Sequence, residues 1–322
     1  MLKTLANILI ALPALALCHS AAAATYPAQP IKLVVPYTPG ASTDTLARLV
    51  AASVSKQLGQ SVIVENKPGA GGIIASDYVK QQKPDGYTFM LTTDGILSVN
   101  PSVYKRLPYD PLKDFTPLTI AVAVPDVLVV QSSSAFKSLQ DVVAYAKAHP
   151  DALSFGSAGI GSSLHIAGEL FNEMAGIKTT HVPYKGGSAE MNNLLGGHVS
   201  MIYIPMVSAV NMMSSGKIRV LGIGSAKRNP MLPDVPTFDE QGLKGYDSDT
   251  WYGFNMPAGA DARVAATLHD AIVKALAENA ERLRSMGFTI VAGSGQDMDQ
   301  VVRKDIERWR GLIQKAGLYH QQ

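Results

Sequence analysis

Residues 33–44 read LVVPYTPGASTD, an apolar run that passes through a turn of proline and glycine into polar residues. Apolar residues then recur at three- and four-residue spacing over 46–58, and Gly59 follows, which predicts a helix closed by a glycine cap. We expect Ser42 or Thr43 to be its N-cap. Free backbone N–H groups, hydroxyls and the positive helix end would meet there, which predicts a site for a carboxylate or phosphate. The alternative is an ordinary turn whose cap residues serve only their own helix.

A second strand, turn and helix of this kind lies later in the chain. Residues 153–163 read LSFGSAGIGSS, a short strand followed by a loop of glycine and serine. Apolar residues at helical spacing follow over 164–174, and Gly176 stands where a C-terminal cap belongs. We expect the two loops, one in each half of the protein, to close on a single ligand.

The first 24 residues have the pattern of a secretory signal peptide. Lys3 lies near the start, 8–17 are almost wholly apolar, and the alanines at 22–24 suit cleavage. The apolar run is too short to span a bilayer. We therefore expect export to the periplasm, with residues 1–24 removed to leave 322 − 24 = 298 residues. That length suggests two domains.

Composition excludes several classes of function. Cys18, the only cysteine, lies within the signal, so the mature chain is expected to have no disulfide and no reactive thiol. A lipoprotein would carry its lipid on Cys18, but the bulky Leu17 precedes it where a small residue is wanted. The 28 Lys and Arg nearly balance the 26 Asp and Glu, without a basic run, which argues against nucleic-acid binding.

Known catalytic and cofactor motifs are missing from the sequence. There is no nucleophile elbow, no phosphate-binding P-loop, no complete dinucleotide fingerprint and no histidine pair with zinc spacing. We therefore expect no cofactor, no metal and no enzymatic activity. The rival hypothesis is an exported enzyme that uses His165 with Ser162 or Ser163, although a histidine in a first helical turn more often packs or caps.

Strands alternate with helices along the chain, which predicts α/β sheets with ligands at the carboxyl ends of the strands. Apolar stretches near 115–131 and 251–257 are expected to cross between two lobes, the first of them as two separate strands interrupted by prolines. We expect lobe 1 to contain 25–122 and 252–322, and lobe 2 to contain 123–251. A ligand cleft would lie between them.

The candidate ligand-binding residues come from the two loops and from the neighbouring strand ends. Asp44 either contacts the ligand or serves the helix dipole, and Asp94 follows a strand in a turn. Tyr37, Tyr203 and Trp251 are either core residues or walls of the cleft. The candidates are Tyr37, Gly40, Ala41, Ser42, Thr43, Asp44, Asp94, Ser157, Ala158, Gly159, Gly161, Ser162, His165, Lys185 and Tyr203.

Four ordered motifs resemble the Bug (Bordetella uptake gene) family, the substrate-binding proteins of tripartite tricarboxylate transporters. They are PYTPG with Asp44-x-x-Ala47-Arg48, then 64–72 (VENKPGAGG), 157–165 (SAGIGSSLH) and 182–187 (VPYKGG). The resemblance implies a type II periplasmic-binding-protein fold with a Venus-flytrap cleft. It also implies delivery of the ligand to a large and a small membrane subunit by a protein that we expect to be monomeric.

Within the family, the loops matching 40–44 and 157–165 grip a ligand carboxylate through backbone amides, hydroxyls and bound water. Ala41 replaces the usual second glycine, and alanine tolerates positive φ poorly. Ile204 stands where the family often has an acid, which favours a less polar ligand end.

The charge pattern of the loops also restricts the ligand. Neither 37–47 nor 152–177 contains Lys or Arg, so Lys185 is the nearest obvious cation. We therefore expect a mono- or dicarboxylate with an aliphatic or aromatic middle, rather than citrate, because neutral donors hardly offset the burial of three charges. A subunit that reports ligand to a membrane sensor would share the same cleft.

Overall fold

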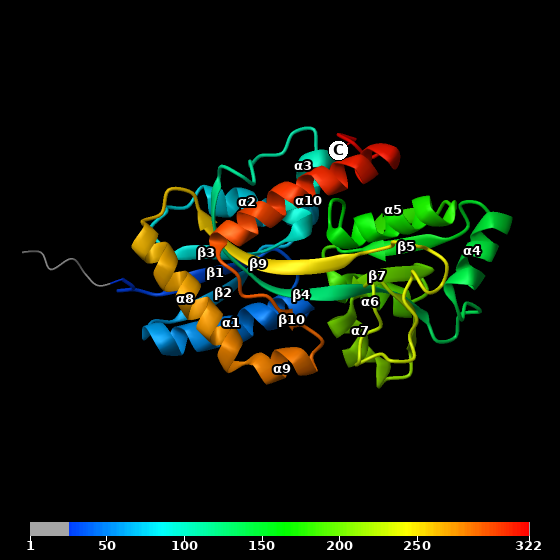
Figure 1. Ribbon diagram of the computed structural model, residues 1–322, viewed down its shortest axis with the longest axis horizontal. Coiled ribbons are helices and arrows are strands. Elements are labelled where there is room, and N and C mark those ends of the chain that lie inside the picture. The colour runs from blue at the N-terminus through cyan, green and yellow to red at the C-terminus, as the bar shows by residue number, and fades with distance from the viewer. Residues whose placement is uncertain (1–25, 322) are drawn as a thin grey trace, which may run out of the picture.

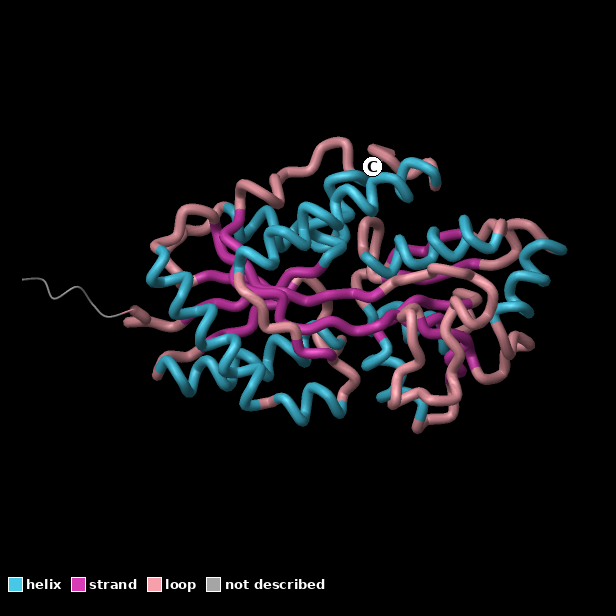
Figure 2. The backbone as a smooth tube through the Cα atoms, viewed as in Figure 1, coloured by secondary structure: helices cyan, strands magenta, loops and turns pink. Residues whose placement is uncertain are grey.

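The computed structural model describes residues 26–321, so the predicted signal peptide and Cys18 lie outside the described residues. Two lobes lie side by side, and two long strands run from one into the other (Figures 1 and 2). Each lobe is a sheet with helices on both faces, which confirms the predicted two-lobed α/β architecture. Within the described residues, no helix is long and apolar enough to cross a membrane.

The first lobe is built from both ends of the described chain. Its elements are β1 (Ile31–Val35), α1 (Ser42–Leu58), β2 (Val62–Asn66), η1 (Ala70–Gly72), α2 (Ile73–Lys80), β3 (Thr88–Thr93), η2 (Gly95–Val99), α3 (Asn100–Val103), α8 (Ala262–Glu278), α9 (Ala280–Ser285), β10 (Thr289–Ile290) and α10 (Gly295–Lys315). Helices α1, α8 and α9 lie on one side of the sheet, and α2, α3 and α10 on the other (Figure 1). The loop that enters α1 therefore starts from the carboxyl end of a buried strand.

The second lobe is formed by the middle of the chain. Its elements are α4 (Leu139–Ala148), β5 (Ser154–Ser157), α5 (Ser163–Ala175), β6 (Thr180–Pro183), α6 (Gly187–Leu195), β7 (Met201–Pro205), α7 (Met206–Met213) and β8 (Ile218–Ile223). Strands β5 and β6 are parallel, as are β5 and β7. The carboxyl ends of β5, β6 and β7 all lead into helices that start at the cleft.

Strands β4 (Phe115–Gln131) and β9 (Asp249–Pro257) connect the lobes, and the spatial order of the strands is β2-β1-β3-β9-β4-β7-β5-β6. Strand β4 pairs with β9 up to Pro125 and with β7 from Asp126. The prediction of two separate strands here is wrong, because β4 is continuous. Pro117 lies at a register shift and Pro125 at the end of the β9 ladder, positions where a missing N–H is tolerated.

The predicted lobe boundaries at 122/123 and 251/252 fall inside β4 and β9 and stay a prediction. Helices α8 and α9 are separate, because Asn279 has non-helical backbone angles between them. Gly59 and Gly176 close α1 and α5 in the left-handed conformation, as predicted.

Helix α10 reaches beyond the first lobe. It packs against β4 and η2, and its last turns meet α5 of the second lobe. There Trp309 and Ile313 pack with Ile166, while Lys315 Nζ lies 3.5 Å from Glu173 Oε1. In Figure 1 this helix runs along the side of the molecule opposite α7 and α9.

Candidate functional site

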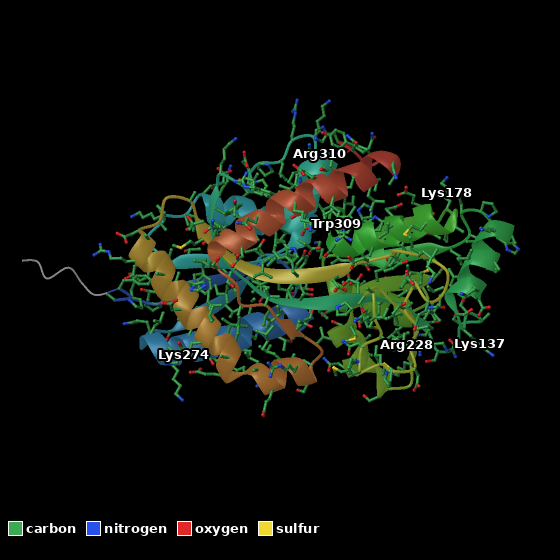
Figure 3. All side chains as sticks on the ribbon, in the orientation of Figure 1. Lys137, Lys178, Arg228, Lys274, Trp309 and Arg310 are labelled. Atoms are coloured by element: carbon green, nitrogen blue, oxygen red, sulfur yellow. The ribbon has the colours of Figure 1, made fainter. Side chains whose placement is uncertain are left out.

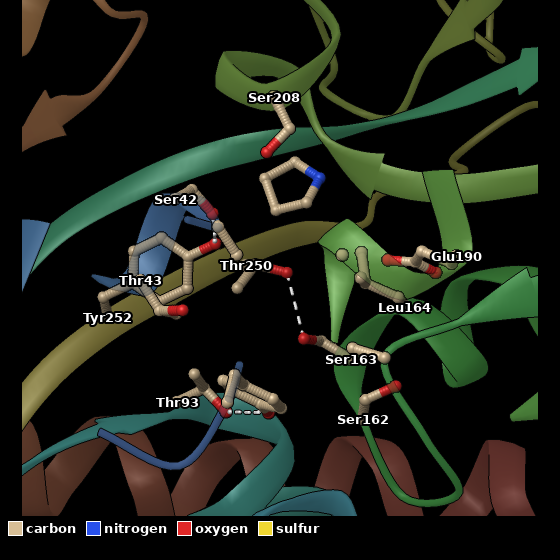
Figure 4. Close-up of a pocket in the computed structure, with 15 residues that line it drawn as sticks. Ser42, Thr43, Thr93, Ser162, Ser163, Leu164, Glu190, Ser208, Thr250 and Tyr252 are labelled. Atoms are coloured by element: carbon tan, nitrogen blue, oxygen red, sulfur yellow. Dashed lines mark hydrogen bonds between the residues drawn. The ribbon is translucent and has the colours of Figure 1, made fainter. Parts of the chain in front are cut away.

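The starting ends of four helices meet at a pocket between the lobes (Figure 4). Helix α1 contributes Ala41, Ser42 and Thr43, and α5 contributes Ser162, Ser163 and Leu164. Helix α6 contributes Gly187 and Glu190, and α7 contributes Pro205 and Ser208. The remaining lining residues are Tyr37, Thr93, Ala158, Thr250 and Tyr252. Free N–H groups at a helix start attract anions, so this arrangement favours a negatively charged ligand group.

Both predicted loops line the pocket. Of the predicted residues, Tyr37, Ala41, Ser42 and Thr43 lie on the first-lobe side, and Ala158 and Ser162 on the second-lobe side. Their direct contact with ligand stays a prediction.

The first loop has a different cap from the predicted one. Ala41, not Ser42 or Thr43, is the N-cap of α1, and its side chain cannot accept a hydrogen bond. The hydroxyls of Ser42 and Thr43 are therefore not used as caps, and Ser42 Oγ instead lies 3.2 Å from Tyr252 Oη. Ala41 has φ −83°, so it replaces the usual glycine without strain, while Gly40 takes the positive φ of +85°.

Asp44 stabilises the first loop by hydrogen bonds and does not line the pocket. Its carboxylate accepts hydrogen bonds from Gly40 N at 3.1 Å, from the Arg48 guanidinium at 2.9 and 3.0 Å, and from Asn66 Nδ2 at 3.0 Å. Burial alone would raise the pKa of Asp44, but these donors outweigh it and lower the pKa. The four-residue spacing to Arg48 was a sequence signal for this structural role.

We expect Asp44→Asn to lower the free energy of unfolding by about 1–3 kcal/mol, because an amide cannot satisfy all of these donors. Urea unfolding at neutral pH measures the change. The control is Asp299→Asn, which breaks an ion pair of the same spacing with Arg303 on the surface of α10. That control should cost less than about 1 kcal/mol. Equal losses of unfolding free energy in the two variants would contradict the stabilising role of Asp44.

The second loop is held by its own hydroxyls. Ser162 is the N-cap of α5, where its Oγ accepts from His165 N at 3.2 Å and donates to Gly159 O at 2.7 Å. Ser157 Oγ lies 2.6 Å from His181 Nε2 and does not line the pocket. Gly159 and Gly161 adopt φ of +124° and +78°, which explains why the loop needs glycine at both positions.

His165 lies beneath this loop and is buried. Its Nδ1 accepts a hydrogen bond from Gly161 N at 3.3 Å, and its ring stacks on His181 with centroids 4.0 Å apart. Burial lowers the pKa of His165 to about 4 and also lowers the pKa of His181. Both rings are therefore neutral at pH 7, and neither lines the pocket.

Several other predicted residues lie away from the pocket. Lys185 is exposed and Gly40 borders an adjoining cleft. Tyr203 packs in the core of the second lobe, and Trp251 is buried with its Nε1 donating to Asp305. Ile204 is also a core residue and does not line the pocket, so the less polar ligand end stays a prediction.

Three acids that are buried around the pocket are Asp94, Asp126 and Glu190. Burial raises the pKa of all three well above the usual range. Asp126 on β4 accepts from Thr250 Oγ1 at 2.9 and 3.0 Å, and Thr250 Oγ1 lies 3.0 Å from Ser163 Oγ. This network joins the strand crossing to the start of α5. Figure 4 draws its contact between Thr250 and Ser163 as a dashed line.

No Lys or Arg lines the pocket among the described residues. Lys137, Lys178 and Lys274 are exposed at the periphery of the molecule (Figure 3). Within residues 26–321, no cluster of three or more His, Cys, Asp or Glu side chains has the arrangement of a metal site.

The lobes touch on both sides of the pocket. Ser188 Oγ donates to Pro39 O at 3.3 Å, and Tyr104 Oη donates to Ile160 O at 3.0 Å. Gly95 approaches the second loop so closely that an added Cβ would lie 2.8 Å from Ser163 N. These contacts across the cleft are those of a closed arrangement.

A family profile described as "Tripartite tricarboxylate transporter family receptor" (TctC) matches residues 46–318. The chain belongs to the TctC family. Protein BugT of Bordetella pertussis is 33% identical over 320 residues, covering 98% of each chain. This relative also confirms the resemblance to the Bug proteins.

Solved TctC-type structures share the fold. An R. palustris protein, Rpa4515, solved with adipate, is 36% identical with a TM-score of 0.88, covering 91% of this chain and 98% of that one. MatC from Rhodopseudomonas palustris, solved with bound malate, is 31% identical with a TM-score of 0.86, covering 89% and 100%. This TctC-family chain therefore has the fold of periplasmic binding proteins.

Proposed function

We propose that this protein is a periplasmic receptor that captures a small carboxylate and delivers it to the large and small membrane subunits of a tripartite transporter. The observation that carries the proposal is the meeting of four helix starts at one interlobe pocket. The solved relatives with adipate and malate support a carboxylate ligand. In this proposal the protein acts by binding, without catalysis, and the predicted signal peptide supports a periplasmic location.

The hydrogen-bond donors of the pocket limit how much negative charge a bound ligand can carry. A helix start contributes roughly 0.3–1 kcal/mol to an anion, and up to about 2 kcal/mol when partly buried. Such neutral donors secure one carboxylate, whereas a tricarboxylate would need cations that the lining does not provide. The ligand is therefore less charged than citrate.

We expect a thermal-shift screen to find mono- or dicarboxylates that stabilise the protein, while citrate does not. A ligand at a hundredfold excess over its Kd adds about 2.7 kcal/mol to the free energy of unfolding, which gives a rise in Tm of several degrees. Protein refolded from denaturant serves as the control, because it has lost any ligand carried over from expression. Strong stabilisation by citrate would contradict the proposed ligand class. A screen in which no carboxylate stabilises the protein would contradict it as well.

Delivery to a transporter is tested separately from binding. A strain that lacks this protein should lose uptake of the radiolabelled carboxylate found in the screen, and the intact gene should restore it. Unchanged uptake in the deletion strain would reject the transport role while leaving the binding result in place.

A further inference from the structure

Glu190 is the acid that lines the pocket. It lies in the first turn of α6, on the opposite side of the pocket from Ser42 and Tyr252 (Figure 4). Its side chain is fully buried, and neither carboxyl oxygen has a hydrogen-bond partner among the described residues. A buried polar group without a partner is costly, so this residue needs an explanation.

Stabilisation of its own helix does not explain it. Asp44, Asp141 and Asp297 also lie in first helical turns, and each accepts hydrogen bonds from a nearby backbone N–H. Glu190 accepts none, although a first-turn acid gains from the helix dipole. Its carboxyl group lies at the pocket beside Gly187, where an added Cβ would be 3.5 Å from Glu190 Oε1, and it accepts no hydrogen bond from the described residues there.

The surroundings of Glu190 supply no positive charge. The titratable groups that act on it or are affected by it are Tyr37 at the end of β1, Tyr184 after β6 and Asp126 on β4. None of them is a cation, and no Lys or Arg is among the described residues that line the pocket. A ligand group that donates hydrogen bonds would therefore be the partner that Glu190 lacks among the described residues.

We propose that Glu190 selects a carboxylate that also carries a protonated amine, with the carboxylate at the helix starts of α1 and α5 and the ammonium group at Glu190. This inference rests on the proposed function. The ammonium donates to an otherwise unpaired carboxylate, and the ligand as a whole is neutral, which suits a pocket that offers helix starts and one acid.

The same argument distinguishes an amino carboxylate from a dicarboxylate. A dicarboxylate such as adipate would place its second carboxylate near Glu190, where two like charges repel unless one is protonated. An amino carboxylate binds with Glu190 ionised. Because burial raises the pKa of Glu190 in the free protein, binding of the amine releases a proton, whereas a second carboxylate leaves Glu190 protonated and releases none.

Isothermal titration calorimetry on the wild-type protein tests the proposal with two sets of ligands. The six-carbon set is hexanoate, 2-aminohexanoate, 6-aminohexanoate and adipate, and the four-carbon set is butyrate, 2-aminobutyrate, 4-aminobutyrate and succinate. Within at least one set, an amino carboxylate should bind about ten- to a hundredfold more tightly than its methyl-ended and dicarboxylate partners. Titrations in two buffers of different ionisation enthalpy should show proton release.

Glu190→Gln keeps the size of the side chain and removes its charge. The preference for the amine and the proton release should disappear, and the dicarboxylate should bind as well as before or better. Glu281→Gln changes an exposed first-turn acid in α9 and should leave every value unchanged. The wild-type panel remains a test even if the Glu190 variant folds poorly.

The outcomes distinguish the inference from the proposed function. Binding of hexanoate or adipate with no advantage for any amine, or binding of an amine without proton release, would overturn the role of Glu190 while the carboxylate receptor stands. Absence of binding by every carboxylate in both sets would overturn both.

Discussion

Gly95→Ala should weaken ligand binding by roughly five- to a hundredfold, because the added methyl group keeps the lobes from closing. A Cβ at this position would lie 2.8 Å from Ser163 N and 3.0 Å from Gly161 O, both in the backbone of the opposite lobe. Gly95 does not have a positive φ, so alanine fits the first lobe itself. Calorimetry with the best ligand of the screen measures the loss.

Gly311→Ala in α10 is the matched control, since nothing lies within 4 Å of its added Cβ. Small-angle scattering should show that ligand reduces the radius of gyration of the control but not of Gly95→Ala. Full affinity together with normal compaction in Gly95→Ala would show that this contact is not needed for closure.

His165→Asn should make the protein less sensitive to acid. The pKa of His165 is lowered from 6.5 to about 4 in the folded protein, so the unfolded chain takes up a proton first as the pH falls. The wild type therefore loses stability between pH 6.5 and pH 4, by about 3 kcal/mol from this residue alone. Asparagine keeps an acceptor for Gly161 N–H but does not titrate.

The measurement is the difference in unfolding free energy between wild type and His165→Asn at pH 7 and at pH 4.5. The difference should shift in favour of the variant at the lower pH. Comparing the two proteins removes the opposite contribution of Asp94, Asp126 and Glu190, whose raised pKa values stabilise the folded protein as the pH falls. A difference that does not change with pH would contradict the neutral, buried state of His165.

The two loops could be predicted from the sequence because their geometry depends on neighbouring residues. Gly59 and Gly176 end helices by local backbone preference, and the Gly/Ser pattern around Ser162 specifies a capped helix start. The cap of α1 was predicted wrongly because a serine or threonine is favoured only when its side chain can turn back to the helix. Here the hydroxyl of Ser42 is instead hydrogen-bonded with the hydroxyl of Tyr252.

Glu190, Ser208 and Thr250 could not be found in this way. An acid in the first turn of an amphipathic helix is normal in any α/β protein, and nothing local shows that Glu190 would be buried without a partner. Ser208 and Thr250 reach the pocket only because α7 and β9 meet the first lobe there. For Tyr203 and Trp251 the sequence could not decide between the core and the wall of the cleft. An aromatic residue beside a cleft and one in the core look alike in sequence.

From the contacts of the last turns of α10, we expect the molecule to open on the opposite side. Trp309 and Ile313 tie the first lobe to Ile166 along one side, in addition to the strand crossings. Rotation about these ties widens the opposite side, between α1, α6 and α7, where a cleft bordered by Met191, Met212 and Met286 adjoins the pocket. We therefore expect a one-sided aperture, in which a ligand leaves over a rim of flexible thioether side chains instead of the rigid backbone of the two loops.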